Sequence, residues 1–127
     1  MTPDEITLII PRERALFGVA HLVLGGLGIR LNLTIEHLED MQLALETLLE
    51  RAEEGGDITV ALRIADGKLE ARVGPMRDGV RDELSAEPGD DVGLRRILDA
   101  VVDRVELESA DNCDWVKLTK KVEERAS

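Results

Sequence analysis

The spacing of the apolar residues changes from helical to alternating at Gly55 and Gly56, and this change limits the fold more than any other feature. Before the two glycines, apolar residues recur every three or four positions, and Thr34 is a suitable N-cap, so we predict a helix over residues 34–54 that ends at the glycines. After them, apolar residues alternate with polar ones on both sides of an Asp66-Gly67 turn, which is typical of a β-hairpin. The chain therefore has to pack a long helix against a hairpin.

The segment before residue 34 predicts a strand and a second helix. Residues 6–11 are mainly β-branched and apolar and end at Pro11, so we expect a strand there. Apolar residues at helical spacing follow from near Arg12 into the stretch VLGGLGIRL, residues 23–31. Its glycines resemble a phosphate-binding loop, but their position favours the C-terminal end of a packing helix.

The segment after the hairpin predicts a loop, a helix and a second hairpin. Residues 74–90 have little periodicity, so we expect a long loop with a short helical turn around residues 81–84. A helix capped by Asp90 or Asp91 should end near Asp103, and a hairpin should close the chain around the turn SADNCD. The sum is an α+β fold in one domain, residues 1–127: a two-layer sandwich with a mixed, mostly antiparallel sheet and helices on one face.

The charge of the chain limits its partners. With 27 acidic and 16 basic residues, the formal charge is -11, which argues against nucleic acid because phosphate binding needs a basic surface. No apolar run is long enough to span a membrane, and the start lacks the features of a signal peptide. Cys113 is the only cysteine, so no disulfide framework is expected, and the cytoplasm is the expected compartment.

Few residues suggest catalysis or metal binding by themselves. Neither His21 nor His37 has a partner at ligand spacing, so we expect no metal site on them. Asp90 and Asp91 could hold Mg²⁺, although a helix cap explains them more simply. The single tryptophan, Trp115, either faces outward toward a partner or lies over a sheet edge.

The order strand, helix, helix, hairpin, loop, helix, hairpin resembles that of a known family. Three segments carry the resemblance: LEDMQLALETLLERAEE, ITVALRIADGKLEARV and GDDVGLRRILDAVVDRVELESADNCDWVKLTKKV. They resemble the anti-sigma-factor serine kinases, small members of the histidine-kinase/Hsp90-like ATPase superfamily. The resemblance covers about residues 6–122 and implies the histidine-kinase-like ATPase fold, with ATP and Mg²⁺ as the family's cofactors.

On the long helix, the family has a Glu that acts as base or positions water, then, four residues later, an Asn that helps to hold Mg²⁺. An ungapped match to this pattern places Thr47 and Arg51 at these two positions. A threonine is no base at neutral pH, and an arginine is a cation where a cation should bind. A shift of one residue would place Glu46 and Glu50 there instead, but it would turn the apolar stripe of the helix away from the core.

The adenine and phosphate contacts of the family are also changed. Pro75 occupies the position of the Asp that binds adenine, and Arg77 that of a Gly that passes close to the base. The glycine-rich phosphate lid corresponds to DDVGL, in which Gly93 and Leu94 are kept.

In that segment, Asp90 and Asp91 would repel a triphosphate. We therefore expect no catalytic residue and no cofactor. The resemblance then implies a regulatory module that binds a sigma factor or an antagonist domain, with binding surfaces on the first helix and the sheet edge and a homodimer as one arrangement. The alternative is an active ATP-dependent serine kinase that uses Glu46 or Glu50 as base, with Asp78 near the adenine.

Overall fold

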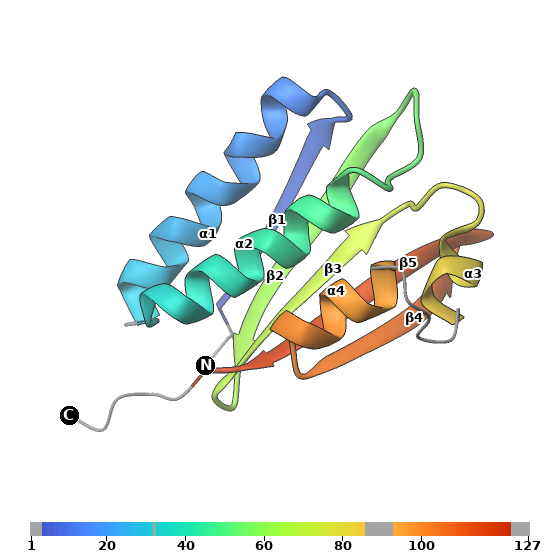
Figure 1. Cartoon of the computed structure of the whole chain (residues 1–127). Helices are drawn as coiled ribbons and strands as arrows, with labels where there is room; N and C mark the ends of the chain where they lie inside the picture. Colours follow the sequence, from blue (N-terminus) through green and yellow to red (C-terminus); the bar gives the residue numbers. More distant parts are fainter. Residues whose placement is uncertain (1–3, 32, 86–92, 123–127) are drawn as a thin grey trace.

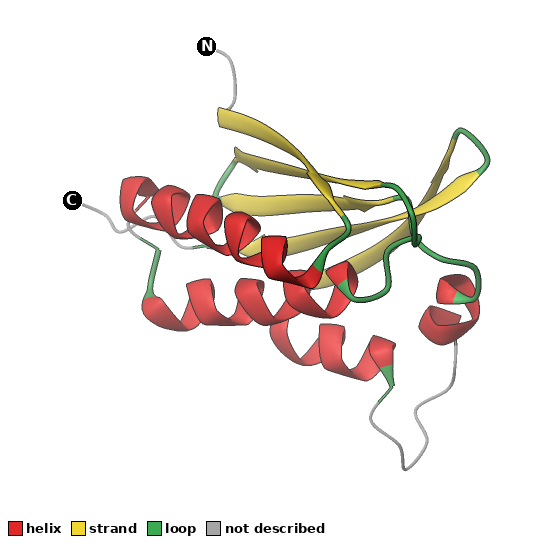
Figure 2. Cartoon of the chain, turned by 90° about the horizontal axis from the view of Figure 1, so that it is seen from above, coloured by secondary structure: helices red, strands yellow, loops and turns green. Residues whose placement is uncertain are grey.

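A computed structural model of the chain describes residues 4–31, 33–85 and 93–122, which form two layers (Figure 1). The helices all lie on one face of a five-stranded sheet (Figure 2). In chain order the elements are β1 (Asp4–Pro11), a 3-10 turn (Arg14–Leu16), α1 (Phe17–Leu31), α2 (Ile35–Leu49), β2 (Asp57–Ala65), β3 (Lys68–Gly74), α3 (Val80–Ser85), α4 (Leu94–Val101), β4 (Arg104–Ala110) and β5 (Cys113–Lys121).

The sheet has the strand order β1-β2-β3-β5-β4. Every pair of neighbouring strands that the structure describes is antiparallel. We predicted a mixed, mostly antiparallel sheet, and the observed sheet contains no parallel pair among the described strands. Both predicted hairpins are present. Asp66 and Gly67 join β2 to β3 with φ values of 54° and 71°, and Asp111 and Asn112 join β4 to β5 with φ values of 53° and 63°. Positive φ at both central residues suits a two-residue turn between twisted strands.

The hydrophobic core lies between the sheet and the helices, as the alternating and helical spacings predict. Alternate residues of β2 and β3 point into this core, and the apolar stripe of α2 covers them. The largest fully buried side chains come from both layers: Leu24, Met41, Leu45, Leu48, Leu49, Ile58, Leu62, Leu69, Leu94, Leu98 and Leu118.

The predicted end of the long helix is wrong. α2 ends at Leu49, five residues before the predicted end at residue 54, because the backbone after it pairs with the segment that follows β3. Ala52 forms an isolated antiparallel bridge with Met76, and the Glu53 amide donates to the Pro75 carbonyl at 3.0 Å. This long-range pairing replaces the last helical turn.

The predicted position of the first glycine cluster is also wrong. Gly25, Gly26 and Gly28 lie inside α1, which begins at Phe17 and continues to Leu31. The helix continues through them because its other side is buried in the core. Gly28 faces α2, since a Cβ added there would lie in van der Waals contact with Cδ1 of Leu38, at 3.4 Å.

The segment between β3 and α4 contains the predicted short helical turn, which is α3. The predicted caps of α4, Asp90 and Asp91, lie outside the described residues, and the N-cap position of α4 is Gly93. Among the described residues, no helix is long and apolar enough to cross a membrane.

The face of the sheet opposite the helices carries charged side chains that pair across the strands. Arg72 on β3 contacts Glu108 on β4 at 2.8 Å, and Lys117 on β5 contacts Glu70 on β3 at 3.1 Å. Trp115 lies on the same face, half-buried, with the Arg72 guanidinium 5.4 Å from its ring centroid. The tryptophan is thus neither fully exposed nor placed over a sheet edge.

Candidate functional site

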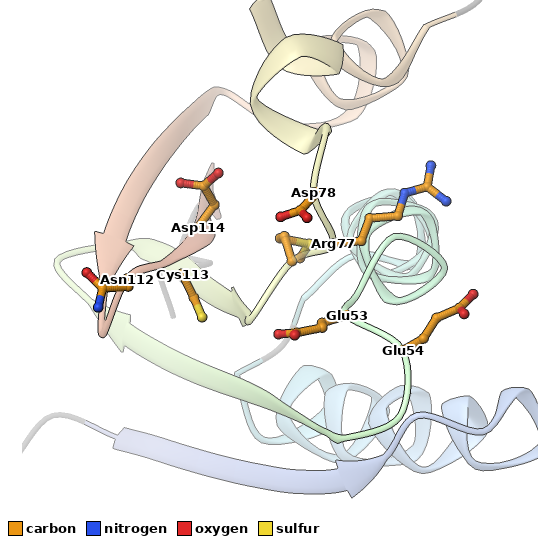
Figure 3. A pocket seen from close by; sticks show the side chains of 8 residues that line it. Glu53, Glu54, Arg77, Asp78, Asn112, Cys113 and Asp114 are labelled. Atoms are coloured by element: carbon orange, nitrogen blue, oxygen red, sulfur yellow. The ribbon is translucent and has the colours of Figure 1, made fainter.

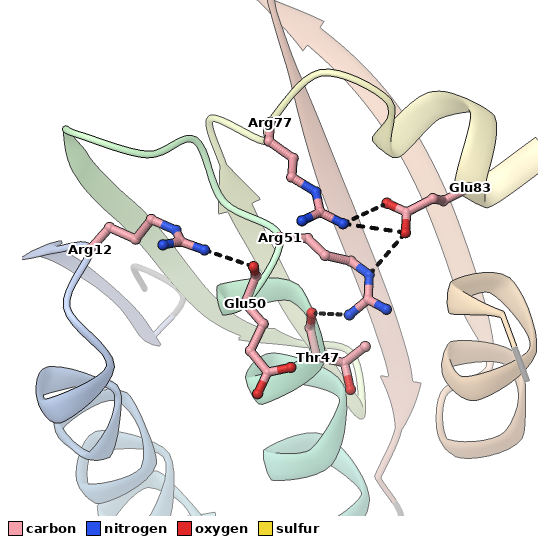
Figure 4. A network of polar contacts seen from close by, with 6 residues as sticks. All are labelled: Arg12, Thr47, Glu50, Arg51, Arg77 and Glu83. Carbon is pink, nitrogen blue, oxygen red and sulfur yellow. Dashed lines mark hydrogen bonds and ion pairs between the residues drawn. The ribbon is translucent and has the colours of Figure 1, made fainter.

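The site to which the sequence points lies where the C-terminal end of α2 meets α3 (Figure 4). Thr47 and Arg51 are one helical turn apart, and the side chains of both are largely buried. The Thr47 hydroxyl donates to the Leu43 carbonyl at 2.8 Å, and the Arg51 guanidinium donates to the Thr47 carbonyl at 2.9 Å. The arginine therefore satisfies a carbonyl at the end of a helix, where a cation is favoured.

Glu83 of α3 joins the two arginines of the site. Its carboxylate lies 3.4 Å from Nε of Arg51 and 3.5 Å from Nη2 of Arg77, as Figure 4 shows. The Arg77 amide also donates to the Arg51 carbonyl at 3.0 Å. We call Arg51, Arg77 and Glu83 the arginine clasp. It connects the end of α2, the segment after β3 and α3 through ion pairs and one backbone hydrogen bond.

The alternative pair, Glu46 and Glu50, lies on a different side of α2. Glu46 is exposed. The Glu50 carboxylate pairs with Arg14 at 2.6 Å, and the Glu50 carbonyl accepts from Arg12 at 2.8 Å. Glu50 thus binds the connection between β1 and α1, not the arginine clasp.

Beside the clasp, an open pocket of about 580 Å³ lies between the end of α2, the segment after β3 and the β4–β5 turn (Figure 3). Asp78, the alternative adenine contact, lines this pocket, and the Arg77 guanidinium extends away from Cys113 and Asn112. Asp114, which also lines it, is paired with Arg81 at 2.9 Å. The full lining is Glu53, Glu54, Met76, Arg77, Asp78, Asn112, Cys113 and Asp114.

Four of the eight lining residues are carboxylates, so this pocket does not attract a triphosphate. No group of three or more histidine, cysteine, aspartate or glutamate side chains in the described part of the chain could hold a metal ion.

Pro75, Gly93 and Leu94, the other described residues that we matched to the family's nucleotide contacts, take part only in backbone hydrogen bonds and in packing. Pro75 carries no carboxylate and accepts the Glu53 hydrogen bond through its carbonyl. Gly93 is exposed at the start of α4, and Leu94 is 2% exposed and belongs to the core. Asp90 and Asp91 are outside the described residues. If the ungapped match to the family pattern is applied, Thr47, Arg51 and Pro75 supply neither a base, nor an amide ligand for Mg²⁺, nor a carboxylate for adenine, so under this prediction the residues do not fit Mg²⁺ with a nucleotide.

Sequence reasoning did not identify Glu83 or Arg12 as site residues. Glu83 belongs to a segment whose charges look solvated in the sequence, and only the packing of α3 through Val80 and Leu84 turns it toward the arginines. The four-residue spacing of the apolar residues Val80 and Leu84 was the signal available in the sequence. Arg12 was placed at a helix start, whereas it lies before the helix and reaches the end of α2.

Comparison with known proteins agrees with this architecture. The predicted α+β fold is shared with a solved structure: the crystal structure of the RsbU and RsbW domains of Rv1364c from Mycobacterium tuberculosis matches 94% of this chain, and the match covers 32% of that chain, with a TM-score of 0.68 and 14% identity. At that identity the match shows the fold alone.

Sequence similarity also relates the chain to RsbW proteins. The chain is 32% identical over 77 residues to the serine-protein kinase RsbW of Listeria innocua, a match that covers 55% of this chain and 49% of the relative. The RsbW of Listeria monocytogenes gives the same identity and the same coverage. The chain thus spans about half the length of the curated relatives it matches. No family model matches the chain. The resemblance to anti-sigma-factor serine kinases is therefore confirmed as a distant relationship.

Proposed function

We propose that this chain is a regulatory protein-binding module that resembles an anti-sigma factor and neither binds nor hydrolyses ATP. It acts by binding a sigma factor or an antagonist domain in the cytoplasm. The observation that carries the proposal is the arginine clasp: Glu83 holds Arg51 and Arg77, the two residues that the ungapped match predicts at the metal-ligand position and at the adenine-side glycine.

Two features of the clasp support this function. The Arg51 guanidinium donates hydrogen bonds to the Thr47 carbonyl and the Glu83 carboxylate, so a cation already fills this position without a metal ion. A nucleotide would also have to displace the Arg77 side chain, which binds α3 through Glu83. Similarity to RsbW in sequence and fold supports a role in protein recognition, because the scaffold is kept where the nucleotide contacts are not.

Calorimetric titration with Mg-ATP tests the first half of the proposal. We expect no heat of binding and no rise in melting temperature at millimolar nucleotide. A matched variant, Thr47→Glu with Arg51→Asn, introduces the family's Glu and Asn at the two positions that the ungapped match predicts. It should still not bind Mg-ATP, because Pro75 and Arg77 are unchanged. Micromolar binding by the natural chain would overturn the proposal in favour of an active kinase.

Co-purification from the native host tests the second half. A tagged chain should retain a sigma factor, an antagonist domain or another regulatory protein. Recovery of none of these, from cells in which the chain is folded and expressed, counts against the proposal.

Homodimerisation through the sheet edge completes the proposal. β1 is an edge strand of eight residues, and Ile9 on it is 65% exposed. Edge strands with apolar residues and free backbone groups pair readily with a second strand. Sedimentation velocity should show a dimer, and Ile9→Lys should convert it to a monomer. A natural chain that is monomeric at all concentrations would contradict the proposed homodimer.

A further inference from the structure

The side of α1 that faces away from the core carries large apolar side chains that are exposed. Ala20, Leu24 and Leu27 are buried and belong to the core. The opposite side carries Leu22, 78% exposed, and Ile29, 83% exposed, and α1 contains no acidic residue. Large apolar side chains that are exposed opposite the buried side of a helix are typical of a surface that another protein covers.

Three glycines make this exposed side open as well as apolar. A Cβ added at Gly18, Gly25 or Gly26 would meet no atom within 4 Å. The glycines alternate with Leu22 and Ile29 at spacings of three and four residues, which is the spacing of one helix face. Small residues between large ones let a second helix approach closely and place its own side chains over the glycines.

The exposed side of the neighbouring helix is acidic. α2 packs beside α1, and its sequence IEHLEDMQLALETLL contains neither lysine nor arginine. Glu36, Glu39 and Glu46 are exposed on it, together with Leu43, which is 47% exposed, and Ile35, which is 74% exposed. An apolar surface on α1 thus lies next to a surface of carboxylates on α2.

We infer that α1 and α2 together dock a basic amphipathic helix of a partner protein, an inference that rests on the proposed protein-binding function. The apolar side of that helix covers Leu22 and Ile29 of α1, and its lysine or arginine side chains face Glu39 and Glu46 of α2. Charge complementarity selects this partner: a second copy of the chain would bring its own acidic α2 toward these glutamates, and like charges repel.

The test uses a fluorescein-labelled peptide of about 18 residues that contains only leucine and lysine at helical spacing, a length that supports a helix. A peptide of the same pattern with glutamate in place of lysine is the partner control. Fluorescence anisotropy should show saturable binding of the lysine peptide and none of the glutamate peptide, with weaker binding as the salt concentration rises.

Paired variants separate this surface from the charge of the whole molecule. Leu22→Ser with Ile29→Ser, and separately Glu39→Gln with Glu46→Gln, should each weaken binding at least about tenfold. The matched control, Glu5→Gln with Asp57→Asn, removes two exposed carboxylates on β1 and β2 and should change the affinity less than about twofold.

A further variant distinguishes a loss of peptide binding from a loss of protein stability. Gly25→Ala with Gly26→Ala adds two methyl groups in open space, so the helix should be at least as stable while the peptide binds more weakly.

Three outcomes would overturn the inference: equal losses in the carboxylate variant and its control, unchanged binding in the serine variant, or a natural dimer that the serine variant makes monomeric. None of these depends on the Mg-ATP titration, so the proposed function is tested separately.

Discussion

Gly74 provides a quantitative test of the packing on the uncovered face of the sheet. It is the last residue of β3 and lies against Trp115 of β5. A Cβ at this position would lie 2.4 Å from Cδ2 and 2.7 Å from Cε3 of the indole ring. Real Cβ atoms do not approach ring carbons this closely, so Gly74→Ala has to displace the ring.

The displacement has two costs. The ring has to move by about 1 Å to restore van der Waals contact near 3.5 Å, and an inserted methyl group in a packed site typically costs about 1–3 kcal/mol. A displaced ring also loses its contact with the Arg72 guanidinium, which is worth about 0.5–1 kcal/mol at an exposed site. We expect Gly74→Ala to lower the free energy of unfolding by about 2–3 kcal/mol.

Guanidinium denaturation followed by circular dichroism measures this change. Gly93→Ala is the matched control, because an added Cβ there meets nothing within 4 Å, and it should stay within about 0.5 kcal/mol of the natural chain. Gly74→Ala combined with Trp115→Leu should cost less than the sum of the two single changes. Equal unfolding midpoints for Gly74→Ala and Gly93→Ala would refute the packing argument.

Three further substitutions test other parts of the molecule. Glu83→Gln should lower the free energy of unfolding by about 0.5–1 kcal/mol, since its contacts are long and partly exposed, and amide hydrogen exchange should rise in α3 before α4. Asp40→Asn should cost about 1–2 kcal/mol in denaturation, because it removes the carboxylate 3.2 Å from the largely buried ammonium of Lys120. Gly26→Ala should raise the melting temperature, since alanine is favoured over glycine in a helix interior by about 1 kcal/mol; a lower value would mean that the added methyl group is not in open space.

The sequence was sufficient for the layers of this fold but not for the ends of its helices. The switch of apolar spacing at Gly55 located α2 and the β2–β3 hairpin because each spacing matches one backbone geometry. The end of α2 depends on the bridge between Ala52 and Met76, residues far apart in the chain, and local spacing carries no signal for such a pairing. The glycines of α1 show the same limit, since burial of one side of the helix outweighs their low helix propensity.

The sequence predicted which residues of α2 and the segment after β3 belong to the candidate site, but it did not predict the hydrogen bonds and ion pairs that these residues make. The apolar stripe of α2 fixes which residues are buried, and it places Thr47 and Arg51 toward α3. The assignment of these residues to the family's catalytic pair stays a prediction. The role of Glu83 depends on how α3 turns against α2, which no spacing in the sequence specifies.

The unequal distribution of charge between the two faces also affects how fast a partner arrives. On the face of the sheet opposite the helices, Arg72 pairs with Glu108 across β5, and Lys117 pairs with Glu70 on the adjacent strand, whereas the exposed glutamates of α2 have no such neighbours on their own helix. The exposed side of α2 is therefore a local source of negative potential. A cationic partner is rotated by this field before contact, so most of its encounters begin on the productive side, and its association rate falls as salt shortens the range of the field.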